Sequence, residues 1–230
     1  MDLGRGLLAP QLLDRNEHAA RIALVSTMAT LLAGDQLDIE VHVEAGLRLD
    51  LVDVAATVAH HGRGGPPARI RLNLVVDRAA TLVWEAEPLV VCHGADVARI
   101  TRVEVAEGAR LLLRDRIVLG RHREAAGSLS CRTRIALGNR PALAEDLELA
   151  APALPEQGGR TTPRVLGANT VMDTVTAVGW QPTRYDDPGG PSVFELAVPG
   201  AVARLLRTET HQSSCTPLWA SWQSQLAGRS

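Results

Sequence analysis

Three segments of the chain repeat one pattern, in which an alternating apolar run, a small-residue corner and a second apolar run follow one another. The segments are Val41–Asp53, Leu74–Ala86 and Val103–Asp115. They align without gaps at offsets of 33 and then 29 residues. Alternation with a period of two is typical of half-buried strands, so each repeat predicts a strand, a corner and a second strand.

The apolar phase is the same in all three repeats. Val41, Leu74 and Val103 are equivalent, and the apolar phase continues on the second arm at Leu49, Leu82 and Leu111. The corners that separate the arms are Gly46, Ala79 and Gly108. A period near thirty residues with two strands per unit indicates stacked units that bury their apolar faces against one another. Ordinary meander hairpins share this local pattern and are the alternative.

We therefore predict a mainly β fold, a β-solenoid-like stack of many strands with two short C-terminal α-helices. The helices are expected at Ala201–Thr210 and Pro217–Leu226, the latter with Leu218, Trp222 and Leu226 on one face. Residues 1–21 lack periodicity and are expected to form a poorly ordered lead-in. Residues 22–230 are expected to form a single β domain.

Composition excludes several classes of function. The chain has 230 residues, a formal charge of −2, and arginine in all 24 of its basic positions. Without lysine there is no Schiff-base chemistry and no Walker-type phosphate loop. The near-neutral charge gives no general attraction to nucleic acid or to anionic membranes. No stretch of the chain reads as a signal peptide or a membrane span, so we expect a cytoplasmic protein.

Acidic residues on the apolar phase are the most informative candidates for a site. Asp53 and Asp115 follow inward-facing leucines at equivalent points of the repeat, and Glu145 interrupts a similar run, Leu143–Leu149. A buried unpaired carboxylate is costly, so such residues are either paired or line a wet cavity. The competing interpretation is a structural ion pair to one of the chain's many arginines, such as Arg114, Arg116 or Arg121, or a bulge that turns the acid outward.

Two other groups of residues leave alternatives open. Glu85 and Glu87 lie on one strand face, as a pair of acids in a β-helical carbohydrate-active enzyme would, although six aromatic residues in the whole chain argue against a sugar-binding groove. His60, His61 and Cys92 would suit a small metal-storage or metal-sensing protein, although no further ligand lies at suitable spacing.

Several modest motifs occur in an order and spacing that resemble one known family. They are Leu31-Leu-Ala-Gly-Asp35, Ala55-Ala-Thr57, Trp84-Glu-Ala-Glu-Pro-Leu89 and Leu111-Leu-Leu-Arg-Asp-Arg-Ile-Val-Leu-Gly-Arg121. Together they resemble the urease accessory protein UreD, also called UreH, over roughly residues 22 to 226.

The resemblance implies a non-enzymatic scaffold that takes part in nickel insertion into urease. It implies contacts with apo-urease and with the accessory proteins UreF and UreG, and an internal polar route for Ni²⁺ without a tightly bound cofactor. Such a route needs weak oxygen ligands, because thiolates or clustered imidazoles would trap nickel. For the lining we expect Asp35, Asp53, Asp115, Glu145 and Thr57. For the partner-binding surface we expect the C-terminal helical region, including Trp219 and Trp222.

Overall fold

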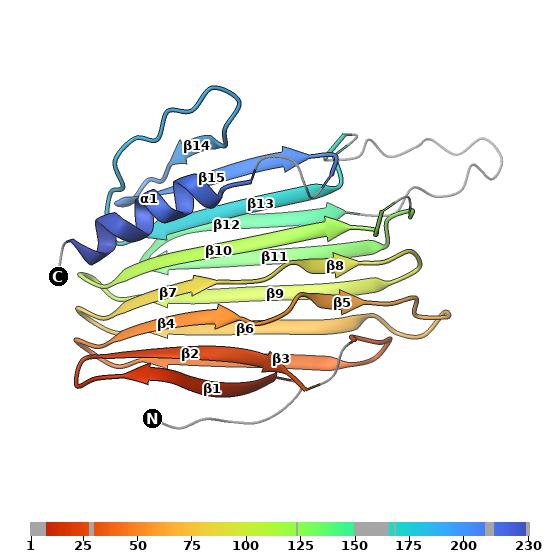
Figure 1. The fold of residues 1–230 in the computed structure, drawn as a ribbon, viewed down its shortest axis with the longest axis horizontal. Coiled ribbons are helices and arrows are strands. Elements are labelled where there is room, and N and C mark those ends of the chain that lie inside the picture. The colour runs from red at the N-terminus through yellow and green to blue at the C-terminus, as the bar shows by residue number, and fades with distance from the viewer. Residues whose placement is uncertain are drawn as a thin grey trace.

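Two β-sheets packed face to face make up most of this computed structural model, which describes residues 8–27, 30–122, 124–149, 166–167, 169–209 and 214–228 (Figure 1). The larger sheet contains ten strands. They are β1 (Leu8–Arg15), β2 (Ala19–Ser26), β4 (Arg48–Asp53), β5 (Thr57–Ala59), β7 (Thr81–Glu85), β8 (Leu89–Val91), β10 (Arg110–Leu119), β13 (Val171–Val178), β14 (Ser192–Glu195) and β15 (Gly200–Arg207).

The smaller sheet contains five strands in the order β12-β11-β9-β6-β3. They are β3 (Gln36–Val43), β6 (Ala68–Val76), β9 (Asp96–Val105), β11 (Ser128–Leu137) and β12 (Arg140–Leu149). One helix, α1 (Thr216–Ala227), lies on the outer face of the larger sheet, near the C-terminus (Figure 1).

The three sequence repeats form the parallel centre of both sheets. In each repeat the first arm lies in the small sheet and the second arm in the large sheet, so the corner carries the chain from one sheet to the other. Residues equivalent in the repeat are direct partners between strands: Val41 pairs with Leu74, and Leu74 with Val103. The stacked arrangement is therefore confirmed, and the alignment of the repeats gives the register of the parallel strands.

The corners share one backbone conformation. Gly46, Ala79 and Gly108 have φ angles of 75°, 59° and 79°. This left-handed region favours glycine, and alanine adopts it only at some cost. The common φ explains why small residues recur at these three points.

Two expectations about the chain ends are wrong. Strand β1 lies within the predicted irregular lead-in, pairing antiparallel with β2, while residues 1–7 lie outside the described residues. The segment Ala201–Thr210 is not a helix: Gly200–Arg207 is strand β15, between β13 and β14, and Thr210 is outside the described residues. Ala201, Ala203 and Leu205 face α1 with the period of a strand. The second predicted helix is confirmed as α1.

Candidate functional site

A band of polar side chains crosses the middle of the sandwich between two apolar clusters. On β9, Val97 belongs to one cluster and Val103 to the other, and Arg99 and Thr101 lie between them. Each of the neighbouring strands β10 to β13 shows the same interruption. The polar band consists of Arg99, Thr101, Asp115, Thr133, Glu145, Thr174, Thr176 and Arg204.

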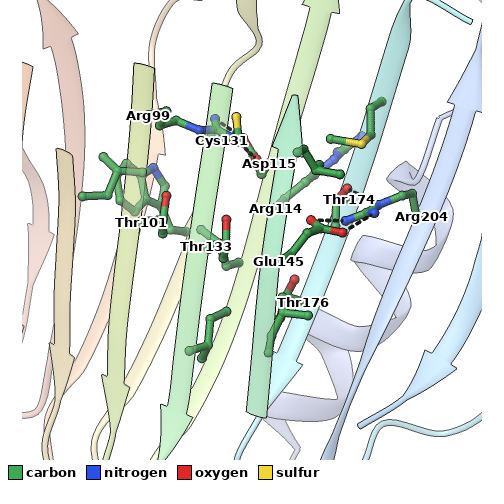
Figure 2. Close-up of a pocket in the computed structure, with 18 residues that line it drawn as sticks. Arg99, Thr101, Arg114, Asp115, Cys131, Thr133, Glu145, Thr174, Thr176 and Arg204 are labelled. Carbon is green, nitrogen blue, oxygen red and sulfur yellow. Dashed lines mark hydrogen bonds and ion pairs between the residues drawn. The ribbon is translucent and has the colours of Figure 1, made fainter. Parts of the chain in front are cut away.

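These eight residues line a cavity of about 60 Å³ between the sheets (Figure 2). Leu72, Trp84 and Leu113 are among the residues that close it with apolar surface. A polar cavity of this size has room for several water molecules, since one water needs roughly 10–15 Å³ measured in this way. The Nε of Arg99 is buried and has no acceptor among the described residues, so a water inside the cavity would satisfy it.

The first carboxylate of the band is held by an arginine from the opposite sheet. Arg99 on β9 donates to both oxygens of Asp115 on β10, at 2.8 and 2.5 Å. Arg99 is 7% exposed. Burial opposes its charge, but the Asp115 carboxylate outweighs this effect and the pKa of Arg99 is raised.

The second carboxylate is also held by an arginine from the opposite sheet, but here the acid is on the small sheet and the arginine is on the large one. Arg204 on β15 of the large sheet donates to both oxygens of Glu145 on β12, at 2.7 and 2.9 Å. Its Nε also donates to the hydroxyl of Thr174 at 3.2 Å. Strand β12 is the edge of the small sheet, and both side chains of the pair are 24% exposed. Figure 2 shows the pair with both dashed contacts.

Asp53 lies at the point of the repeat equivalent to Asp115, yet no arginine among the described residues is hydrogen-bonded to it. Its carboxylate accepts from the indole Nε1 of Trp84 at 3.0 Å and from the backbone N–H of Glu87 at 3.1 Å. Burial raises the pKa of Asp53 to about 6, in spite of these hydrogen bonds. Asp53 is thus bonded to Trp84, which lines the cavity, but Asp53 itself does not line it.

The structure therefore brings together Asp115 and Glu145 and leaves the other expected lining residues elsewhere. Asp35 is in a turn, where its carboxylate accepts from the backbone N–H of Leu32. Thr57 begins strand β5. Neither residue lines the cavity.

Trp219 and Trp222 are core residues rather than surface residues. They are 3% and 0% exposed and pack between α1 and the large sheet. Trp222 also meets Trp180 edge to face, with ring centroids 6.5 Å apart. A partner could reach these indoles only if α1 moved.

The acids and the cysteine that the two alternative functions would use are ion-paired or buried. Glu85 and Glu87 form ion pairs with Arg114 and Arg116, at 2.9 and 3.0 Å. Cys92 is buried, and burial raises the pKa of its thiol. Within the described residues, no group of three or more His, Cys, Asp or Glu side chains is arranged to hold a metal ion.

Sequence reasoning missed the two arginines of the polar band. The arginines named as examples, Arg114, Arg116 and Arg121, are near Asp115 in the chain but pair with other acids. Arg99 and Arg204 nevertheless carry the same signal as the acids, because each takes an inward position between apolar residues of its strand.

Comparison with known proteins agrees with the family that the motifs indicate. The family model described as UreD urease accessory protein matches residues 7–230. The chain belongs to the UreD family. A relative named urease accessory protein UreD 1, from Streptomyces griseus, is 42% identical over 95% of this chain and 83% of its own length. The protein named urease accessory protein UreD from Streptomyces coelicolor is 35% identical over 84% of this chain and 74% of its own length.

The relatives are named as accessory proteins of urease, not as enzymes, which agrees with the expectation that this UreD chain is not an enzyme. None of the described residues lies in a helix with the length and hydrophobicity that a transmembrane span requires.

Proposed function

We propose that this UreD protein is a scaffold for assembly of the urease nickel centre. In this role it binds apo-urease, recruits UreF and UreG, and offers Ni²⁺ a polar route between its two sheets. Membership of the UreD family supports the accessory role. The polar band supports the route, because it is the one level of the described sandwich interior where several oxygen ligands meet.

The chemistry of the band suits a metal ion that passes and does not stay. Its oxygen donors are two carboxylates and four threonine hydroxyls. Oxygen ligands hold nickel more weakly than imidazole or thiolate does. Cys131 also lines the cavity, but burial raises the pKa of its thiol, so it stays protonated and is a poor ligand.

The proposal is tested by expressing the urease structural and accessory proteins with and without this chain. With it, we expect UreF and UreG to co-purify with the tagged UreD protein, and the urease to contain nickel and to be active. Without it, we expect urease that is assembled but lacks nickel. Nickel-loaded urease of full activity in the absence of the chain, or a chain that captures none of these proteins, would contradict the proposal.

A further inference from the structure

Both carboxylates of the cavity are occupied by guanidinium groups. Asp115 accepts two hydrogen bonds from Arg99, and Glu145 accepts two from Arg204. A carboxylate bridged in this way presents no free negative charge to an arriving cation. The two arginines and two acids of the polar band cancel in charge, and Arg114, which also lines the cavity, is paired with Asp173 and Glu85.

The two ion pairs differ in how freely they can open. Arg99 is 7% exposed and its release would strand a charge in the core. Arg204 and Glu145 are each 24% exposed, and Glu145 lies on β12, the edge strand of the small sheet. Arg204 can therefore leave Glu145 and remain hydrated, because solvent reaches this pair.

We propose that Arg204 is a removable cap on a latent divalent-cation site formed by Glu145 and the hydroxyl-lined cavity behind it. With the cap closed, Glu145 is neutralised and the cavity binds no cation. With Arg204 displaced, Glu145 and the hydroxyl groups of Thr133 and Thr174 face the same hydrated space. The proposed cap rests on the proposed nickel route. It assigns control of that route to an arginine, a role that the positions of the acids alone would not reveal.

The cap has a reason in the chemistry of transport. An uncapped carboxylate in a hydrated cavity would hold a divalent ion and turn a passage into a storage site. A guanidinium that competes for the same oxygens keeps the residence time of the ion short. Thr174 supports this arrangement, since its hydroxyl accepts from the Nε of Arg204 and keeps the cap over the cavity.

The test measures Ni²⁺ binding to the purified full chain by equilibrium dialysis, with circular dichroism to confirm folding. We expect Arg204→Gln to bind about one Ni²⁺ per chain, roughly tenfold more tightly than the unaltered protein. Arg134→Gln is the matched control, because Arg134 pairs with Asp146 on the exposed side of the same small sheet. It should bind Ni²⁺ no better than the unaltered chain.

Adding Glu145→Gln to Arg204→Gln should abolish the gain. If Arg204→Gln folds and binds Ni²⁺ no more tightly than Arg134→Gln, the cap is wrong. If Arg204→Gln does not fold, Arg204→Lys keeps the charge but loses the two-pronged contact, and it should bind Ni²⁺ more tightly than the unaltered protein. Equal binding would overturn the inference. These assays contain no urease, so their failure is distinct from failure of the proposed scaffold role.

Discussion

Asp53, Asp115 and Glu145 all face inward, but their surroundings give them different chemistry. Asp115 and Glu145 each meet an arginine from the opposite sheet. Asp53 instead accepts hydrogen bonds from the Trp84 indole and from the backbone N–H of Glu87. Burial therefore dominates at Asp53, and raises its pKa from 3.8 to about 6.

This pKa shift predicts how stability depends on pH. The folded protein binds the Asp53 proton more tightly than the unfolded chain does, so protonation of Asp53 stabilises the folded state. This stabilisation is fully present below about pH 4 and is lost as pH rises through about 6. The shift corresponds to about 3 kcal/mol. Asp53→Asn should remove this pH dependence. As pH rises from 4 to 7, the free energy of unfolding of the variant should increase by roughly 2–3 kcal/mol relative to that of the unaltered protein. Urea unfolding at a series of pH values measures this difference, and parallel curves for the two proteins would contradict it.

At the scale of elements, a buried ion pair fixes helix α1 to the large sheet. Arg114 on β10 is 1% exposed and donates to both oxygens of Asp173 on β13, at 3.1 and 2.8 Å. Asp173 also accepts from the backbone N–H of Cys215, and Arg114 donates to the Thr216 hydroxyl at the start of α1. We therefore expect the burial of Trp219 and Trp222 to depend on this anchor.

Asp173→Ala should leave the Arg114 charge buried with only the half-exposed Glu85 as a carboxylate partner, at a cost of about 3 kcal/mol. We expect a lower urea midpoint and a shift of the tryptophan emission to longer wavelength, because α1 loosens. Asp146→Ala, which breaks an exposed pair with Arg134, should change neither. Unchanged emission in a destabilised Asp173→Ala variant would mean that the anchor does not hold the helix.

The corners of the repeat allow a paired test. A Cβ at Gly46 would meet no heavy atom within 4 Å beyond its chain neighbours, so only the positive φ opposes a side chain there. Gly46→Ala should destabilise the fold by about 1 kcal/mol. Ala79→Gly should stabilise it by less than about 1 kcal/mol, because relief of strain is offset by greater freedom of the unfolded chain. Urea unfolding gives both values, and effects of the same sign would refute the equivalence of the corners.

The elements also show what the sequence could predict. The register of the parallel strands followed from the repeat, because residues that are equivalent in the gap-free alignment are direct partners on neighbouring strands. Strand β15 was missed because its alanines, leucines and arginines favour a helix locally, while pairing with β13 and β14 decides the outcome. The inward phase of Asp115 and Glu145 was visible, but their partners were not. Arg204 is 59 residues from Glu145, and only the packing of one sheet on the other brings them together.

At the scale of the whole molecule, the stacked strand-corner-strand repeats give the sandwich a regular apolar interior, and the polar band interrupts this interior at one level. The band crosses β9 to β13 and β15, and the equivalent level of β3 and β6 is filled by Ile39 and Leu72. At this level the small sheet is therefore polar at β9, β11 and β12 and apolar at β3 and β6. We propose that nickel bound for urease passes through this polar part of the interior.

The most direct measurement is the nickel content of urease activated with a UreD variant whose band is made apolar. Arg204→Met with Glu145→Leu removes both charges together, a change that buried pairs often tolerate. Arg134→Met with Asp146→Leu is the control on the exposed side of the small sheet. We predict that both variants co-purify with the partner proteins, and that only the first lowers the rate of nickel incorporation, by roughly tenfold or more. A folded, partner-bound Arg204→Met and Glu145→Leu variant that loads urease at the full rate would contradict the account.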